Sequence, residues 1–285
     1  MRKSDHTIFK DEQLARTFEE QGYLLLDFLP AEAIAQLRKI LDQTGLHPER
    51  YFYSSSFIED PALKQQISTD LEAVLQPSVD RICHDYRKLG ATFLLKPTGN
   101  ESIMPIHQDW TIVDESAFDS ITIWIPLSDT HEQNGAIKVL PKSHRLTSAL
   151  RSPTISDPIR EIRPLAETLM QPLPMKAGQA FIFSHALLHA SFPNISGQTR
   201  AAVAFGLVHR DARLLFPYKS PDDDMVEILE VGDDFFLNYP KPGERPAQAV
   251  TAERINPDET AVSPEAFRHY YNLQQPGKKR WWKFF

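Results

Sequence analysis

The sequence has almost no cysteine: Cys83 is the single one among 285 residues. An intrachain disulfide is therefore impossible, and a metal site built from several thiolates is excluded. Such sparing use of cysteine is typical of a cytoplasmic protein, and we expect that location.

Basic residues are in the minority, with 31 Lys and Arg against 38 Asp and Glu, which gives a formal net charge of -7 at pH 7. Proteins that bind nucleic acids generally present a basic face to the phosphates. No nucleic-acid partner is therefore predicted.

Long hydrophobic runs are absent as well. No segment approaches the roughly 18 apolar residues needed to cross a bilayer, and the N-terminal sequence MRKSDHTIFKDEQ has no apolar stretch of the kind found in signal peptides. Internal repeats and Gly/Ser linkers are also missing. With 41% hydrophobic residues, the chain can bury a substantial core.

The first third of the chain predicts helices. Asp11 is a suitable N-cap for a first helix that Gly22 would end, and a second helix should follow Pro30. Asp60 can cap a third, longer helix. Within it, Pro77 is expected to cause an interruption or a kink, because proline removes one backbone donor.

From residue 91 onward the pattern changes to short segments of alternating hydrophobic residues, bounded by turns. Asn134-Gly135 is a strong turn signal between two of them. Together with an earlier strand at 23–29, the predicted strands are 91–96, 102–109, 120–126, 136–140, 180–183, 187–191 and 200–209. Many short strands indicate a sandwich or barrel rather than βαβ units. We predict a mainly β fold with α-helices, in which an antiparallel jelly roll is covered by N-terminal helices.

We expect a single domain over residues 1–285. Residues 1–90 would form the helical cover with a first strand, and residues 91–210 the jelly-roll core. Residues 211–285 would form an extension, either a lid over a cavity or a surface addition, and a C-terminal tail.

The segment MPIHQDW at residues 104–110 contains the most informative motif. His107 and Asp109 are two residues apart, so on a strand they would lie side by side on one face. Two histidines and one carboxylate form the facial triad of non-haem Fe(II) oxygenases, and this pair would supply two of the three ligands. Such pairs also arise by chance. His209 and Asp211 form a second pair, which we interpret as a solvated rim pair.

A third ligand and a cation follow later in the chain. His189 and Ser191 share a face of one predicted strand, and Arg200 begins the next, which reads RAAVAFGL. The other residues on the Arg200 face are small: Ala202, Ala204 and Gly206. A large cation among small residues implies a space that needs an anion, and the carboxylate of a ligand would serve.

The chain resembles the phytanoyl-CoA dioxygenase family of Fe(II)- and 2-oxoglutarate-dependent oxygenases from about residue 22 to about residue 208. The resemblance is strongest in FLLKPTGNESIMPIHQDW, SITIWIPLSDTHEQNGAIKVLPKSHR and AGQAFIFSHALLHASFPNISGQTRAAVAF. It implies a double-stranded β-helix, a variant of the jelly roll. It also implies that iron is held by His107, Asp109 and His189.

The same resemblance implies that Arg200 binds the far carboxylate of 2-oxoglutarate, and that Ser191, Trp124 and Lys96 line the 2-oxoglutarate pocket. Taken alone, Trp124 could equally be a core residue and Lys96 a surface lysine. His185, four residues before His189, is an alternative ligand, but it lacks the spacing to Arg200.

The activity implied is hydroxylation of an unactivated C–H bond in a small organic molecule by O2, with release of succinate and CO2. The substrate would be a natural-product intermediate, an amino-acid-like compound or a lipid. Related halogenases replace the carboxylate ligand with a small residue, so Asp109 favours oxygenation. Desaturation, epimerisation and ring formation stay open. So do two other classes, a metal-binding jelly roll without turnover and a zinc hydrolase that uses the same three residues.

Candidate contacts outside the iron site are less specific. Phe57 and Trp110 are candidate substrate contacts, whereas strict strand alternation would point Gln108 away from the metal. The final residues, KKRWWKFF, combine cations with aromatic rings. Such a tail is suited to weak attachment to anionic lipid, to a partner or to a neighbouring subunit. The sequence predicts no particular oligomeric state.

Overall fold

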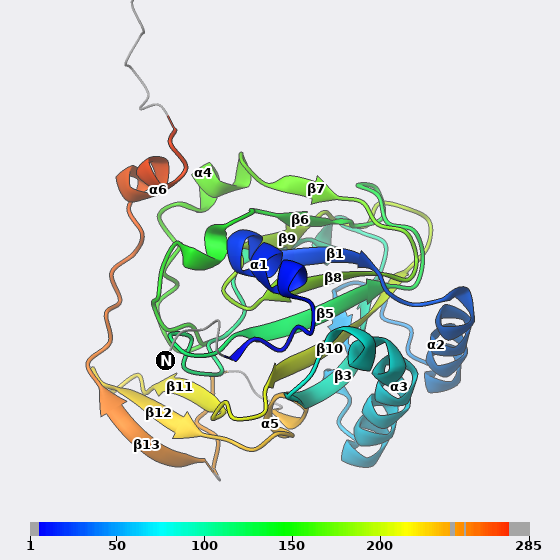
Figure 1. Cartoon of the computed structure of the whole chain (residues 1–285), viewed down its shortest axis with the longest axis horizontal. Coiled ribbons are helices and arrows are strands. Elements are labelled where there is room, and N and C mark those ends of the chain that lie inside the picture. The colour runs from blue at the N-terminus through cyan, green and yellow to red at the C-terminus, as the bar shows by residue number, and fades with distance from the viewer. Residues whose placement is uncertain (1–5, 240–242, 248, 274–285) are drawn as a thin grey trace, which may run out of the picture.

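A computed structural model describes residues 6–239, 243–247 and 249–273. Its centre is a pair of antiparallel sheets that face each other (Figure 1). The larger sheet has the order β1-β8-β5-β10-β3-β2 and consists of β1 (Tyr23–Asp27), β2 (Tyr53–Ser54), β3 (Tyr86–Lys96), β5 (Ser120–Pro126), β8 (Gln179–Ser184) and β10 (Arg200–His209). The smaller has the order β4-β9-β6-β7 and consists of β4 (Met104–His107), β6 (Ile137–Val139), β7 (Gln171–Leu173) and β9 (His189–Ser191). The predicted jelly roll is confirmed.

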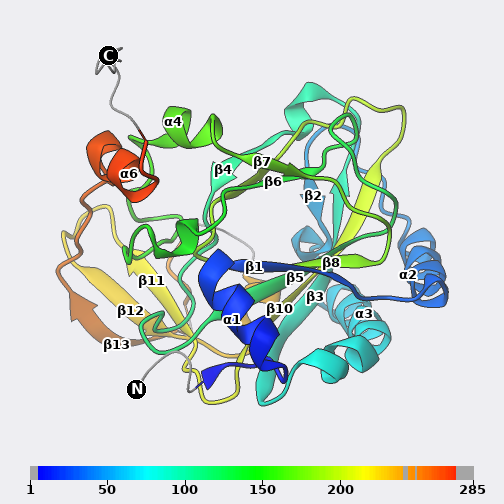
Figure 2. The same ribbon diagram turned by 45° about the horizontal axis from the view of Figure 1, so that its top comes forward.

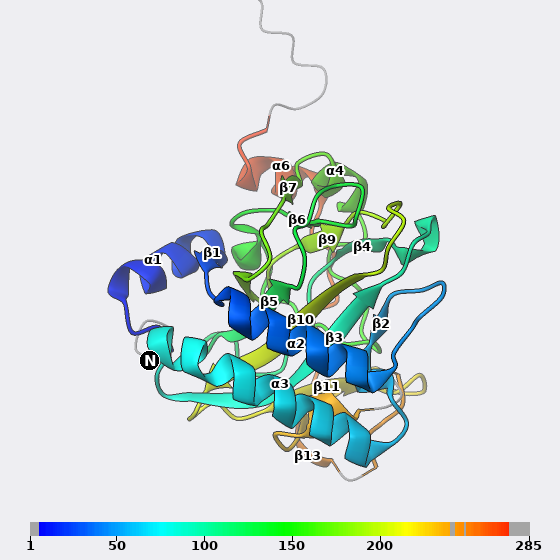
Figure 3. The ribbon, with the colours of Figure 1, turned by 90° about the vertical axis from the view of Figure 1, so that its right-hand side faces the viewer.

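Two helices, α2 (Ala31–Thr44) and α3 (Pro61–Ile82), cover the outer face of the larger sheet and lie side by side across it (Figure 3). The strand sequences explain this contact. Ile123 of β5 and Phe205 of β10 are paired in register and are both completely buried in the same cluster as Leu71 of α3. Burial of these apolar faces stabilises the helical layer on the sheet.

The opposite, inner face of the larger sheet faces the smaller one and is more polar. Because side chains alternate along a strand, Thr122 and Trp124 of β5 and Arg200 and Ala204 of β10 lie on this face. Trp124 and Ala204 are partners in the β5–β10 register. The predicted alternation along β10 therefore places its cation and small residues between the sheets.

Helix α1 (Glu12–Gln21) has the termini that the sequence predicts. The Asp11 carboxylate accepts hydrogen bonds from the backbone N–H groups of Gln13 and Leu14 at 2.8 and 2.9 Å. Gly22 ends the helix with φ at 82°, a left-handed conformation that glycine adopts without steric cost.

Helix α3 differs from expectation in its interior. Asp60 caps it as predicted, but the helix continues through Pro77 to Ile82 as one element, so an interruption is wrong and a kink at Pro77 stays a prediction. Leu75 and Val79, on either side of the proline, are completely buried against the sheet. This packing holds both halves of the helix in place despite the missing backbone donor.

The Asn134-Gly135 turn is present, with φ of Gly135 at 83°. It does not close a hairpin, however, because β5 before it and β6 after it belong to different sheets. The turn instead carries the chain from one layer of the jelly roll to the other.

The chain after residue 210 forms a third sheet, β11 (Leu215–Lys219), β12 (Val226–Glu230) and β13 (Val250–Ile255), with α5 (Phe235–Asn238) and α6 (Pro264–Tyr270) (Figure 2). Phe267 of α6 is buried with Ile106 and Ala190, on the outer side of the smaller sheet. The remaining short elements are α4 (Arg163–Glu167) and three 3-10 turns, Ser55–Phe57, Asn100–Ser102 and Ser143–Arg145.

The tail KKRWWKFF lies outside the described residues, so its predicted contacts stay predictions. Within the part of the chain that the structure describes, no helix combines the length and the apolar character that crossing a membrane would require.

Candidate active site

Three side chains meet between the two sheets. His107 on β4 and His189 on β9 are partners in the strand register, and Asp109 follows β4. One ligand atom from each residue lies within 4.8 Å of the others, and no other group of three His, Cys, Asp or Glu in the described residues does the same. The Nε2 atoms of His107 and His189 are 3.7 and 3.9 Å from Asp109 Oδ1.

The segment after His107 is not a strand, although the sequence predicts one through Asp109. Strand β4 ends at His107, and the Asp109 backbone N–H donates to the carbonyl of His185 at 2.8 Å. Strict alternation therefore stops before Gln108. The prediction that Gln108 lies away from the site is wrong, because it lines a cavity together with His107 and Asp109.

Backbone carbonyls fix the orientation of both imidazole rings. Nδ1 of His107 donates to the carbonyl of Pro105 at 2.8 Å, and Nδ1 of His189 donates to the carbonyl of Leu187 at 3.0 Å. A carbonyl can only accept, so Nδ1 carries the hydrogen in each ring. In the neutral form of each ring, Nε2 therefore carries the lone pair on the side that faces Asp109.

The protonation states also suit a metal. Burial, together with the adjacent His107, lowers the pKa of His189 to about 4, so this ring is neutral at pH 7. Burial opposes ionisation of Asp109, but the neighbouring histidines and Arg151 outweigh it and lower the pKa of the carboxyl. Two neutral imidazoles and one carboxylate are the donors that an Fe(II) facial triad needs.

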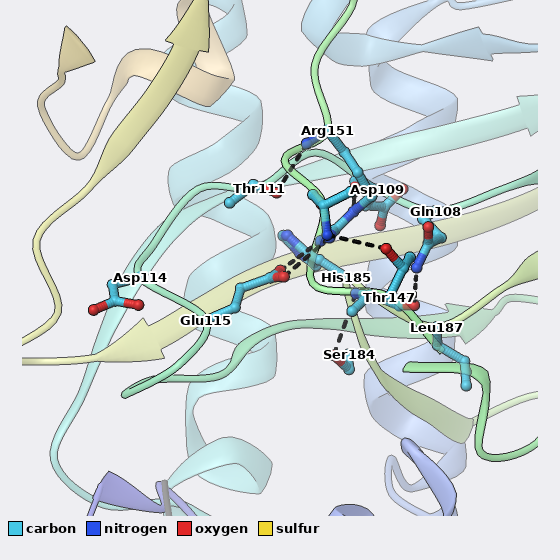
Figure 4. Close-up of polar contacts among 12 residues, drawn as sticks. Gln108, Asp109, Thr111, Asp114, Glu115, Thr147, Arg151, Ser184, His185 and Leu187 are labelled. Carbon is cyan, nitrogen blue, oxygen red and sulfur yellow. Dashed lines mark hydrogen bonds and ion pairs between the residues drawn. The ribbon is translucent and has the colours of Figure 1, made fainter. Parts of the chain in front are cut away.

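Arg151 braces the backbone of this segment (Figure 4). Its side chain is buried, and Nε donates to the carbonyl of Asp109 at 2.8 Å, while Nη1 donates to Glu115 Oε2 at 3.0 Å. Its backbone N–H donates to Thr111 Oγ1 at 3.1 Å. Arg151 is 42 residues from Asp109, and no sequence motif connects them.

A cavity of about 250 Å³, the arginine cavity, opens on one side of the three side chains. It is lined by Phe52, Leu94, Met104, His107, Asp109, Thr122, Trp124, Ile137, Phe183, His189, Ala190, Ser191, Arg200 and Ala204. The Arg200 side chain is buried, and its guanidinium lies 5.0 Å from the centre of the Trp124 ring.

Arg200 lacks an anion. Its Nε and Nη1 atoms are buried without a hydrogen-bond partner, and no ion pair of the described residues includes it. Burial lowers the pKa of Arg200 to about 10, so the group still carries its charge at pH 7. A buried, charged and unsatisfied guanidinium fits the carboxylate of a ligand.

A second cavity of about 350 Å³, the aromatic cavity, opens on another side. It is lined by Ser56, Leu89, Gly90, Thr92, His107, Gln108, Asp109, Trp110, Ile112, Thr122, His185, Ala204, Gly206, Phe236 and Leu237. Four residues line both cavities: His107, Asp109, Thr122 and Ala204. The candidate metal ligands His107 and Asp109 thus lie between the arginine cavity and the aromatic cavity.

The family model for phytanoyl-CoA dioxygenase (PhyH) matches residues 18–202, which cover the helical layer and nearly all of both sheets. The chain belongs to this family. The three side chains between its sheets have the donors that an Fe(II) facial triad needs.

The chain is also similar to individual proteins. The chain is 22% identical over 154 residues to phytanoyl-CoA dioxygenase domain-containing protein 1 of Danio rerio, an alignment that covers 50% of this chain and about half (53%) of that relative. AviO1 from Streptomyces viridochromogenes Tue57 superposes with a TM-score of 0.51 at 19% identity, over 72% of this chain and 98% of AviO1. HygX from Streptomyces hygroscopicus, crystallised with nickel and 2-oxoglutarate, gives a TM-score of 0.48 at 16% identity, over 70% and 87% of the two chains.

The residues at the family's pocket positions lie in two different places. Ser191 and Trp124 line the arginine cavity. Lys96 is the register partner of Arg200, but it is not among the lining residues, and its Nζ donates to the carbonyls of Ser102 and Phe192. It is completely buried, so the surface alternative for Lys96 is wrong. A direct contact of Lys96 with 2-oxoglutarate stays a prediction.

The two residues predicted to contact substrate, Trp110 and Phe57, lie in different places. Trp110 lines the aromatic cavity. Phe57 is 58% exposed, packs its ring edge-on against Tyr53 and lines neither cavity, whereas its neighbour Ser56 lines the aromatic one. Phe236 and Leu237 of α5 also line the aromatic cavity, and the only signal for them in the sequence is the abundance of aromatic residues after residue 210.

The remaining histidines are not grouped with the metal ligands. His185 lines the aromatic cavity, with Nε2 at 3.0 Å from Thr122 Oγ1. His209 is 8% exposed, and its ring centre lies 5.2 Å from that of His6 and 5.8 Å from that of Phe118. The interpretation of the pair as solvated is therefore wrong for His209, which His6 and Phe118 cover, whereas the side chain of Asp211 is 70% exposed.

Proposed function

We propose that this PhyH-family enzyme hydroxylates an unactivated C–H bond of a small organic molecule, with conversion of 2-oxoglutarate and O2 to succinate and CO2. His107, Asp109 and His189 would hold Fe(II), and Arg200 would hold the far carboxylate of 2-oxoglutarate. The observation that carries this proposal is the unsatisfied, buried Arg200 in a cavity that the three candidate ligands also line. Metal binding alone would not require such a cation.

Each part of the site has a separate task in this proposal. Fe(II), when bound, supplies the activation of O2 that no side chain can provide. The two imidazoles and Asp109 would hold the ion and would leave room for further ligands to bind it. Arg200 orients the diacid through a planar, permanently charged group, with Ser191 and Trp124 beside it. The aromatic cavity holds the C–H bond near the metal and excludes water.

Hydroxylation is favoured over halogenation because Asp109 occupies the position that a halide would need. Desaturation, epimerisation or ring formation would use the same iron site with a different placement of the substrate. Product analysis after turnover distinguishes these outcomes, since only hydroxylation adds an oxygen atom from O2 to the product. The substrate's chemical class is considered below.

Anaerobic titration of the protein with Fe(II) and 2-oxoglutarate tests the proposal. We expect a weak visible charge-transfer band, followed by release of succinate once oxygen is admitted. Asp109→Ala should abolish both signals. Metal binding without 2-oxoglutarate binding would instead support a non-catalytic metal-binding module. Activity with Zn(II) that is indifferent to oxygen would support a hydrolase.

Two accessory expectations belong to the same proposal. Cys83 is free and buried, in keeping with a cytoplasmic location, which stays a prediction. A weak contact of the KKRWWKFF tail with a membrane or partner also stays a prediction, to be tested by vesicle sedimentation of the full chain.

A further inference from the structure

The aromatic cavity differs from the arginine cavity in charge. Among the described residues that line it, Lys, Arg and Glu are missing, and the single carboxylate belongs to the candidate metal ligand Asp109. A charged group on a ligand would therefore lose its water without gaining an ionic partner there, which is strongly unfavourable. The part of the substrate that enters this cavity should carry no charge.

One wall of the cavity is apolar and rigid. The ring of Trp110 packs edge-on against Phe216 at 5.9 Å and against Tyr239 at 6.0 Å. Helix α5 also packs closely against β3. A Cβ atom added to Gly90 of β3 would lie only 3.3 Å from Cβ of Leu237 in α5. The extension thus packs closely as part of the wall, which is suited to a compact hydrocarbon surface.

Three other lining residues, Gln108, Thr122 and His185, provide hydrogen-bonding groups. The amide nitrogen of Gln108 donates to the carbonyl of Ala186, which assigns the other end of the amide as Oε1. This Oε1 is buried and has no hydrogen-bond partner. The nearby Thr122 and His185 side chains bond to each other at 3.0 Å. Gln108 Oε1 is therefore an acceptor without a partner, which a hydroxyl or N–H group of a ligand would satisfy.

We propose that the substrate is an uncharged, compact molecule with an apolar body and a hydroxyl-type donor. The body would lie against Trp110, Phe236 and Leu237, and the donor would bond to Gln108. The volume of about 350 Å³ is at the small end of the range for small-molecule sites, so a ring system fits better than a long chain. This inference rests on the proposed function and narrows its substrate to exclude free acids, amines and zwitterions at the reacting end.

Four ligands that share one rigid skeleton test the proposal: adamantanemethanol, adamantanecarboxylate, adamantanemethylamine and the methyl ether of the alcohol. Binding is measured by the change in the visible band of the anaerobic complex with Fe(II) and 2-oxoglutarate, in which the metal is bound to Asp109 and the diacid to Arg200. It is also measured by calorimetry on the metal-free double variant Asp109→Asn/Arg200→Met, in which neither of these two groups can pair with a charged ligand. The alcohol should bind at least about tenfold more tightly than the carboxylate and the amine, because neither charge is paired. It should also bind about tenfold more tightly than the ether, which has no donor for Gln108.

A matched pair of variants tests whether the ligand binds in the aromatic cavity. Phe236→Lys adds a cation to the cavity wall and should reverse the preference from alcohol to carboxylate. Asn238→Lys adds the same charge to the same helix outside the lining residues and should leave the preference unchanged. If Phe236→Lys does not fold, the comparison of the four ligands on the wild-type chain still tests the preference for an uncharged ligand.

The outcomes separate the two proposals. Tighter or equal binding of the carboxylate or amine, or no detectable binding of the alcohol, would overturn the substrate inference. If the visible band fails to form with Fe(II) and 2-oxoglutarate, the proposed function fails, while calorimetry on the metal-free double variant still tests the preference for an uncharged ligand.

Discussion

Arg151 donates from Nε to the backbone carbonyl of Asp109 at 2.8 Å, and the other end of its guanidinium is paired with Glu115 (Figure 4). Both side chains are well shielded from solvent, with exposed fractions of 4% for Arg151 and 18% for Glu115. Asp109 lies beyond the end of β4, so no strand ladder holds it at this point. The position of the candidate iron carboxylate therefore depends on this arginine.

Replacement of Arg151 with Met should weaken Fe(II) binding by about 10- to 100-fold, the usual cost of removing a residue that orients a metal ligand. It should also lower the free energy of unfolding by about 3 kcal/mol, because Glu115 is left buried and unpaired. Fe(II) titration and urea denaturation measure the two effects separately.

A double variant separates orientation of Asp109 from simple stability. Arg151→Met with Glu115→Met removes both buried charges and should recover part of the lost stability without restoring Fe(II) affinity. Arg145→Met, which breaks an exposed pair with Glu19, is the matched control and should change neither. Wild-type Fe(II) affinity in Arg151→Met would exclude the orienting role.

Arg200 should determine the affinity for 2-oxoglutarate rather than for iron. Arg200→Met should raise the KM for 2-oxoglutarate by about 100-fold, because a charge-assisted, two-pronged contact is lost. Arg200→Lys should give an intermediate value, since it keeps the charge but not the planar fork. Steady-state kinetics measure the KM, and anaerobic Fe(II) titration without 2-oxoglutarate should match the wild type. An unchanged KM in Arg200→Met would remove Arg200 from the site.

The alternation of apolar residues predicted the positions of those site residues that lie on regular strands. The strand bounds 120–126 and 200–209 are confirmed without change, because the apolar residues of these strands alternate and pack against the helices. The spacing that places Arg200, Ala204 and Gly206 on one face follows from the same alternation. His107 and His189 come from different predicted strands, and their pairing in register brings them together.

Non-local contacts explain what the sequence could not predict. The end of β4 depends on its pairing with β9 and on the hydrogen bond from the Asp109 backbone N–H to the carbonyl of His185. Because the sequence does not show these contacts, the predicted position of Gln108 was wrong. His209 is buried because His6, from the other end of the sequence, packs against its ring. Phe236 and Leu237 reach the cavity only because α5 returns to β3.

Gly135 should be intolerant of even a methyl group. Its φ of 83° disfavours any side chain, and an added Cβ would overlap Cδ of Lys96. Gly135→Ala should therefore lower the free energy of unfolding by about 2 kcal/mol, from backbone strain and overpacking. Gly197→Ala is the control, because nothing lies within 4 Å of its added Cβ. Urea denaturation of the two variants should give clearly different midpoints, and equal midpoints would contradict the packing of Lys96 against this turn.

Lys96 should make the stability of the metal-free protein depend on pH. Burial, together with the neighbouring Arg200, lowers the pKa of Lys96 from 10.5 to about 7. Between these two values the unfolded chain keeps the proton and the folded chain releases it. The free energy of unfolding should therefore rise with pH from about 7 to about 10, and this contribution is lost as the pH falls through the folded-state pKa. Its size should be on the order of a few kcal/mol.

Comparison with Lys96→Met isolates this contribution, because the other groups that titrate in this range are shared by both proteins. The variant leaves the carbonyls of Ser102 and Phe192 without their lysine donor, but that loss is independent of pH. Urea denaturation at several pH values from 7 to 10 should show the wild type gaining stability relative to the variant as the pH rises. Parallel curves would mean that Lys96 keeps its proton when buried, held by the two carbonyls in spite of the nearby Arg200.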